Sequence, residues 1–358
     1  MRAFAHSSIQ NLLIGMAIPV GKGISQKMNL KLLFVAVIVL ALFAWSSEAC
    51  AGALPTEVIG IFPPDVTEFA IADLQQARSL AWFPQLQRKV LPDQLRQFEL
   101  FLASPGMDHD SRVEQLAWAT VPGSSASQSP QGESDSQETV IVALGQFSPD
   151  STAAYFKARQ RAVVNVRDHF LYPLNGGTGV GGTLVWFVDS TMAVLGERNE
   201  LERVIGINDN EQPNLLSNRS LAAVISQANP HSVIWGVLNS SRANLEMQAI
   251  LPGLAGFSQS QQLFSKVRAF TLEIDADHGT QSTFEAICAS PDDANVFATL
   301  LQASLLYQAS RADQPNQDMT ALLSQAKVAA STDRLDVTLA LTNDQVVDLL
   351  QRNGLSSH

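Results

Sequence analysis

The chain has few cysteines, few aromatic residues and few charges of either sign. Its 358 residues include two cysteines, 7% aromatic residues and 16% charged residues. Two cysteines exclude a disulfide-rich scaffold and a zinc ribbon built on cysteine. Basic residues are outnumbered, because 23 Lys and Arg stand against 34 Asp and Glu. A nucleic-acid binder needs a basic face to neutralise phosphate, so this balance argues against nucleic acid as a partner.

Apolar residues, in contrast, are plentiful and make up 46% of the chain. That fraction is typical of a globular protein and excludes a disordered or collagen-like chain. At roughly 150 residues per domain, the length predicts about two domains. The composition alone indicates no particular chemistry.

The N-terminal region is typical of a secretory signal peptide. An uncharged apolar run covers 32–45 and follows Lys31. The run is shorter than the roughly 20 residues that cross a bilayer, and small residues follow it. We therefore expect 1–53 to be a cleaved export signal, with an uncleaved membrane anchor as the alternative. The start of translation is open between Met1 and Met28, since Met28 would give a more compact signal.

Two processing sites compete at the end of this region. The sequence Ala-Gly-Ala at 51–53 fits the A-x-A rule and would leave a mature chain that begins at Leu54. The sequence Ser-Glu-Ala-Cys at 47–50 resembles a bacterial lipobox, which would place a lipid on Cys50. Ser47 and the charge of Glu48 fit a lipobox poorly, so soluble export is the favoured prediction.

Removal of 1–53 makes the protein more acidic. It leaves 19 basic and 33 acidic residues, which changes the net charge from -11 to -14. Such a surface repels anionic lipid. We therefore expect an extracytoplasmic protein, periplasmic or secreted, that contacts a membrane only through an uncleaved signal or a lipid anchor. Envelope proteins are the expected partners, and the sequence leaves the oligomeric state open.

The pattern of apolar residues predicts a first α+β domain over 54–228. Strands are expected at 66–72, 113–121, 139–147, 164–171, 183–189 and 192–196. Helices are expected at 74–103 with breaks at Pro84 and Pro92, at 149–161, at 200–205 and at 221–227. The polar segment 123–138 has no apolar residue larger than alanine except one proline, so we expect a mobile loop there.

A second α+β domain is predicted over 229–358. Strands are expected at 232–238, 268–275, 281–289 and 335–341. Helices are expected at 243–251, 291–310, 322–329 and 344–351. Strand-helix-strand-strand-helix-strand is the order of a ferredoxin-like half with an antiparallel sheet. The first domain shows the same order with added strands, so we expect two tandem ferredoxin-like (βαββαβ) halves.

Two details indicate an internal duplication. A Ser-Pro-Asp triplet starts the helix after the third strand in each half, at 148–150 and at 290–292. The first strand of each half also leads to an arginine, Arg78 and Arg242. This layout, with the Pro-Gly-Met-Asp turn at 105–108, resembles large families of exported bacterial proteins of unknown function. The resemblance spans most of the mature chain, implies the fold and the localisation, and carries over no catalytic residues.

Two groups of acidic and imidazole side chains are the candidate metal ligands. Asp108 and His109 precede one strand, and Asp275, Asp277 and His278 surround a hairpin turn. Carboxylate and imidazole groups can bind a metal or serve an enzyme site between the two halves. Neither group has the regular ligand spacing of a known metal loop. We therefore expect solvated turns, with no metal and no cofactor.

The remaining motifs favour structure over chemistry. The glycines of 177–182 match G-x-G-x-x-G, but a strand pattern follows where dinucleotide binding needs a helix. The sequence has no G-x-S-x-G motif. Cys288 alternates with Phe284 and Ala286, so we expect a buried apolar residue. The aromatic residues of 82–101 are expected in the core, with a hydrophobic groove as the alternative.

These observations predict an exported protein without catalytic function that serves in binding, scaffolding or assembly, in the periplasm or at the membrane surface. Two alternatives stay open. One is an extracytoplasmic hydrolase or metal-dependent enzyme with its site between the halves. The other is a small-ligand or lipid carrier, which requires a sizeable apolar cavity.

Overall fold

The computed structural model describes 54–123, 137–174, 182–243, 264–276, 279–310 and 325–352. Several predicted features lie outside these residues. They are the signal peptide 1–53 with Cys50, most of the polar loop 123–138, nearly all of the helix 243–251, and Asp277 with His278. None of the helices in the described ranges combines the length and the apolarity that a membrane span requires.

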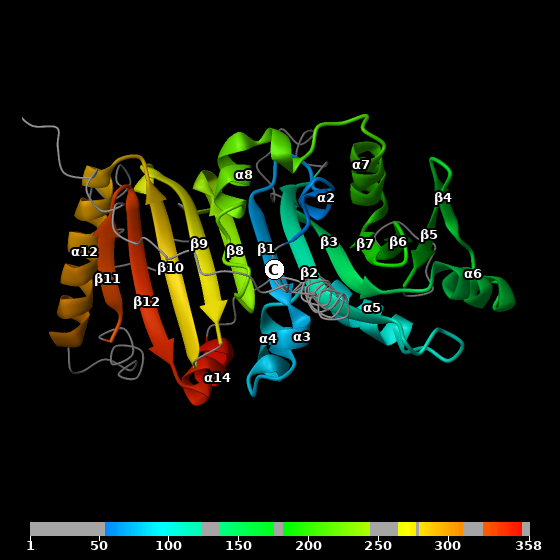
Figure 1. Ribbon diagram of the computed structural model, residues 1–358, viewed down its shortest axis with the longest axis horizontal. Coiled ribbons are helices and arrows are strands. Elements are labelled where there is room, and N and C mark those ends of the chain that lie inside the picture. The colour runs from blue at the N-terminus through cyan, green and yellow to red at the C-terminus, as the bar shows by residue number, and fades with distance from the viewer. Residues whose placement is uncertain are drawn as a thin grey trace, which may run out of the picture. The chain divides into compact units, whose positions relative to one another are not determined.

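One antiparallel sheet runs through the compact unit Cys50–His358, in the order β11-β12-β10-β9-β8-β1-β2-β3-β7-β6-β5-β4 (Figure 1). Its strands are β1 (Glu68–Asp73), β2 (Arg112–Pro122), β3 (Gln137–Gln146), β4 (Val164–Val166), β5 (His169–Pro173), β6 (Leu184–Phe187), β7 (Met192–Gly196), β8 (Ile234–Asn239), β9 (Val267–Asp275), β10 (Thr280–Cys288), β11 (Lys327–Ser331) and β12 (Arg334–Leu341). The predicted α+β class is confirmed. The boundary predicted near residue 228 falls just before β8, and the sheet continues across it.

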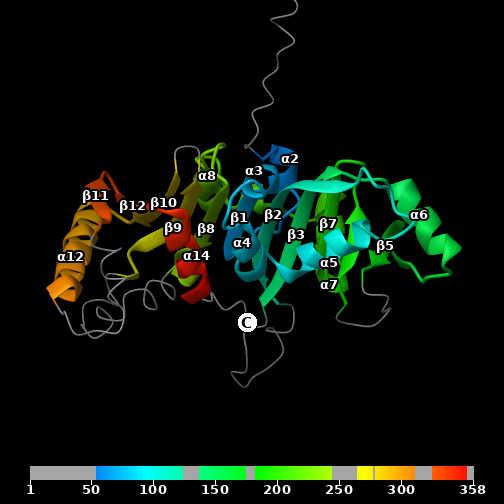
Figure 2. The same ribbon diagram turned by 90° about the horizontal axis from the view of Figure 1, so that it is seen from below.

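Helices pack on both faces of this sheet. They are α2 (Thr56–Ile59), α3 (Leu74–Ala77), α4 (Phe83–Lys89), α5 (Asp93–Leu102), α6 (Pro149–Ala158), α7 (Arg198–Asn208), α8 (Arg219–Ile225), α12 (Pro291–Ser310) and α14 (Asn343–Arg352), with a short 3-10 helix, η2 (Leu215–Ser217). α14 follows the last strand of the second half, yet it packs beside α4 of the first half (Figure 2). The two halves therefore share helix packing as well as the sheet.

The alternation of side chains along β1 separates two cores. Ala70 and Ala72 face a core that includes Trp82 and Phe98 from the α4 and α5 region, both fully buried. Phe69 faces a second core, which α2, α7 and α8 cover. A third core lies under α12 and includes the buried Cys288. The predicted core roles of the aromatic residues at 82–101 and of Cys288 are confirmed.

Proline and serine set the helix boundaries as predicted. Pro84 lies in the first turn of α4, and Pro92 immediately precedes α5, positions where the missing N–H costs nothing. The hydroxyl of Ser148 accepts the N–H of Ser151 at the start of α6. The hydroxyl of Ser290 accepts the N–H of Asp293 in the same way at α12.

The predicted ferredoxin-like topology is wrong. A ferredoxin-like half places its third strand between its first and second strands. Here β8, β9 and β10 are successive neighbours, as are β1, β2 and β3. A helical connection can return the chain to the adjacent antiparallel position or carry it one strand further, and the order of elements along the sequence is the same in both cases.

Two predicted elements also differ from the structure. The strand expected at 164–171 is a hairpin of β4 and β5, with Arg167 and Asp168 in its turn at positive φ. The end of the helix expected at 322–329 is instead part of β11, which pairs with β12. In β11 the hairpin pairing overrides the helix propensity of two alanines, because tertiary pairing outweighs a few tenths of a kcal/mol per residue.

Candidate functional site

One face of the sheet changes from apolar to polar between β8 and β9. In the first half, this face carries buried small and apolar side chains, for example Ala117, Val140 and Val142 under α7. The register from β1 through β8 continues the same face to Trp235 and then to Glu273 on β9. Beyond β8 the face is lined by threonines and charged residues, while α12 packs on the opposite face.

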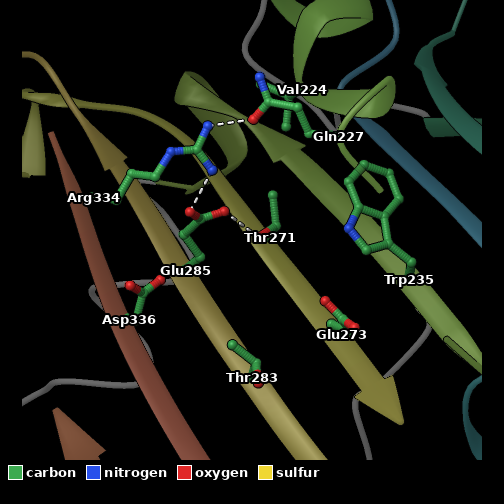
Figure 3. Close-up of a pocket in the computed structure, with 9 residues that line it drawn as sticks. All are labelled: Val224, Gln227, Trp235, Thr271, Glu273, Thr283, Glu285, Arg334 and Asp336. Atoms are coloured by element: carbon green, nitrogen blue, oxygen red, sulfur yellow. Dashed lines mark hydrogen bonds and ion pairs between the residues drawn. The ribbon is translucent and has the colours of Figure 1, made fainter. Parts of the chain in front are cut away.

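This polar region forms a pocket of about 200 Å³, which we call the charged groove (Figure 3). Its lining residues come from α8 and the segment after it and from four strands: Val224, Gln227, Trp235, Thr271, Glu273, Thr283, Glu285, Arg334 and Asp336. The strand register places Glu285 between Thr271 of β9 and Asp336 of β12. Directly opposite side chains in an antiparallel pair lie within contact distance, so the polar groups of three strands form one surface.

An ion pair fixes the centre of the groove. Arg334 pairs with Glu285 Oε1 through one guanidinium nitrogen and donates to Gln227 Oε1 through the other. The hydroxyl of Thr271 donates to Glu285 Oε2 at 3.3 Å. Both oxygens of Glu285 therefore have partners, and the guanidinium is held between a strand and the segment after α8.

Glu273 is fixed on one side only. Its Oε1 accepts hydrogen bonds from Asn229 Nδ2 at 2.6 Å and from Ser232 Oγ at 2.8 Å. Both donors lie in the segment between α8 and β8. No described residue donates to Glu273 Oε2, so this oxygen is available to a ligand.

Asp336 has no hydrogen-bond partner among the residues that the structure describes. Burial, and after it the nearby Glu285 carboxylate, raises the pKa of Asp336 above its ordinary value, while Arg334 acts in the opposite direction. A raised pKa means that the ionised form of Asp336 lacks sufficient stabilisation from its surroundings. A cation bound in the groove would supply that stabilisation.

Trp235 contributes a donor at the other side of the groove. Its side chain is 4% exposed, and Figure 3 shows the indole nitrogen on the side of the ring that faces Thr271 and Glu273. No described residue accepts a hydrogen bond from this N–H group. The groove therefore contains an unpartnered donor as well as unpartnered carboxylate oxygens.

The candidate ligands predicted from the sequence lie elsewhere. Asp108 and His109 are in the turn between α5 and β2, where His109 lines a second pocket of about 350 Å³ with Arg78. Asp275 ends β9, which is three strands away from β2 in the sheet, about 14 Å at the usual strand spacing. Across the described residues, no three His, Cys, Asp or Glu side chains are placed to hold a metal ion.

The groove itself was missed by sequence reasoning. A signal was present, because Thr271 and Glu273, and Thr283 and Glu285, are polar residues two positions apart on predicted strands. Such spacing puts both side chains on one face of a strand. The sequence does not reveal the strand register, which brings the polar residues of β9 and β10 side by side in the sheet.

Comparisons with known proteins give little further guidance. No protein-family model matches the chain, and the search of curated proteins found no match. One similar solved structure is "Structure of crystal form I of TP0453", with a TM-score of 0.42 and 11% sequence identity. The alignment covers 82% of this chain and 96% of that chain. A likeness this distant carries no inference about function.

Proposed function

We propose that this chain is an exported, non-catalytic binding protein and that the charged groove holds its ligand. The observation that carries the proposal is the set of polar atoms left without partners in a pocket that is otherwise fixed by hydrogen bonds. These are the Asp336 carboxylate, Glu273 Oε2 and the Trp235 N–H. These atoms line the groove, and a bound ligand would supply the hydrogen-bond partners that they lack.

The lining of the groove supports binding over catalysis. Its nine residues include no serine, cysteine, histidine or lysine. One of its three carboxylates, Glu285, already has a partner at each oxygen. A general base must be within reach of the proton that it removes and free to accept it, which Glu285 is not. The export pattern of 1–53 supports an extracytoplasmic location for the binding event.

We also propose that the two halves arose by duplication. Outward from the β1/β8 pair, three successive strands come first in both directions. The strands after the next helix, β11–β12 on one side and β4–β7 on the other, then place their last strand beside the third. Hydrogen bonds across this pair are reciprocal: Asp73 N donates to Val233 O at 2.9 Å, and Asn239 N donates to Thr67 O at 2.9 Å. The side chains of Asp73 and Asn239 each accept an N–H three residues later. This relation supports a local two-fold axis between the halves.

A ligand screen on the exported protein tests the proposed function. The protein is recovered from the extracytoplasmic fraction, where N-terminal sequencing is expected to give Leu54 as the first residue. Its Tm is then measured with a panel of small amines, sugars, amino acids and organic acids. We expect some members to raise the Tm of the wild type and to have little effect on Asp336→Asn.

The control is Asp110→Asn, which makes the same charge change at an exposed residue of the first half. Its response to the panel should match that of the wild type. The assignment of the groove as a binding site would be overturned if the panel shifted the Tm of Asp336→Asn as much as that of the wild type. It would also be overturned if no compound raised the wild-type Tm.

A further inference from the structure

The groove contains two different kinds of unused group, and together they define a ligand. We propose that the charged groove binds a small organic molecule that carries a protonated amine beside a neutral oxygen acceptor, such as a hydroxyl. This inference rests on the proposed binding function and adds the chemical class of the ligand.

The charge of the groove requires a cation. Glu273, Glu285 and Asp336 line it, and Arg334 is the cationic residue among its nine lining residues. With all four ionised, the lining carries two more negative than positive charges. Arg334 is already engaged by Glu285 and Gln227, so its charge is committed to holding the groove together. Glu273 Oε2 and the Asp336 carboxylate are left to receive the N–H groups of an amine.

Trp235 requires that the same ligand also offer an acceptor. The register places Trp235 on β8 opposite Glu273 on β9, and both side chains line the groove. The acceptor must be neutral, because a carboxylate or phosphate would be repelled by the three acidic residues of the groove. A hydroxyl or carbonyl oxygen adjacent to an amine meets both demands.

The size of the groove limits the ligand to a small molecule. Its volume is about 200 Å³, below the roughly 300–1,000 Å³ of sites that hold drug-sized ligands. Thr283, on the strand between Glu273 and Asp336, lines the middle of the groove and offers a hydroxyl that can donate or accept. A hydroxylated amine of about the size of a single sugar fits these limits.

The test uses four small molecules that separate the contribution of the protonated amine from that of the neutral oxygen acceptor. Glucosamine has both the amine and neutral oxygens, N-acetylglucosamine and glucose lack the charge, and cadaverine lacks the oxygen. Binding to the wild-type mature protein is measured by calorimetry at constant ionic strength. We expect glucosamine to bind at least about tenfold more tightly than the other three, since each lost charge-assisted hydrogen bond costs about this factor.

Two variants assign the contacts. Asp336→Asn removes the charge at an unpartnered carboxylate, and Trp235→Phe keeps an aromatic ring and removes the N–H. Each is expected to weaken glucosamine binding about tenfold, while Asp110→Asn leaves it unchanged. The Tm of each variant without ligand shows whether the variant is folded. If Trp235→Phe does not fold, Asp336→Asn alone decides the test.

The outcomes separate this inference from the proposed function. If N-acetylglucosamine or cadaverine binds as tightly as glucosamine, the amine–oxygen assignment is wrong, although binding at the groove stands. The assignment also fails if glucosamine does not bind while other compounds raise the Tm in a groove-dependent manner. If no compound binds and the groove variants respond as the wild type does, both proposals fail.

Discussion

Glu200, at the start of α7, is a buried carboxyl group whose protonation is linked to folding. It is 4% exposed, and its Oε2 has no hydrogen-bond partner among the described residues. Burial, then a hydrogen bond and repulsion from Glu138, raises the pKa of Glu200 to about 8, with a smaller contribution from Glu197. In the folded protein this carboxyl group is therefore largely protonated at pH 7.

This raised pKa predicts that stability falls as the pH rises. The unfolded chain ionises Glu200 above its ordinary pKa of 4.5, whereas the folded protein retains the proton to about pH 8. The free energy of unfolding should therefore decrease between pH 5 and pH 8, by at most about 1.4 kcal/mol per pH unit from this group. Glu200→Gln, which is neutral at every pH, should remove this slope and be more stable than the wild type at pH 8.

Chemical denaturation at several pH values measures this effect. The control is Glu202→Gln, because Glu202 is on the same helix and forms an exposed ion pair with Arg198. Exposed pairs of this kind contribute little, so the slope of the control should match that of the wild type. An unchanged slope in Glu200→Gln would show that another group is responsible.

At the scale of single elements, the β4–β5 hairpin is closed by an unfavourable turn. Arg167 and Asp168 have φ values of 49° and 67°, the left-handed conformations of a type I′ turn. Asn-Gly is the preferred sequence there, because glycine adopts positive φ without a Cβ penalty. Arg167 also pairs with Glu211, so Asp168 is the residue that can be replaced without loss of a contact.

We predict that Asp168→Gly stabilises the protein by about 0.5–1 kcal/mol. Thermal or chemical denaturation measures the change. Asp168→Ala is the matched control, since it removes the carboxylate and retains the Cβ. Asp168→Ala should give no gain, and equal stability of the two variants would attribute the effect to charge instead of backbone conformation.

At the scale of the whole molecule, the β1–β8 pair joins the two halves. Ala70 lies opposite Gly236, and a Cβ added to Gly236 would lie 3.3 Å from the Cβ of Ala70. The hydrogen bonds from Asp73 to Val233 and from Asn239 to Thr67 make this a non-hydrogen-bonded pair, in which side chains are closest. The absence of a side chain on Gly236 therefore eases the close approach of the two strands here.

Enlarging this position should weaken the connection between the halves. We expect Gly236→Val to lower the free energy of unfolding by about 1–3 kcal/mol, the usual cost of overpacking. Gln281→Val is the control, because it adds the same side chain at an exposed position of β10. Wild-type stability of Gly236→Val in denaturant titrations would mean that the strands can separate slightly at no cost.

The sequence by itself determined most of the local structure. Alternation of apolar residues located β1 and β12, Pro84 and Pro92 divided the first helical region, and Ser148 marked the start of α6. These features depend on residues close together in the chain, since capping, proline geometry and side-chain periodicity are local. The buried state of Cys288 followed from the same periodicity.

Only the tertiary structure decided the order of the strands and the existence of the groove. The sequence of strands and helices fits both a ferredoxin-like half and the observed order, because the partner of a strand depends on where its connection returns. Glu285 lies between Thr271 and Asp336 and pairs with Arg334, which is 49 residues away. Arg334 in turn donates to Gln227, which is 107 residues away. Such register is set by the packing of the whole sheet, which no local pattern encodes.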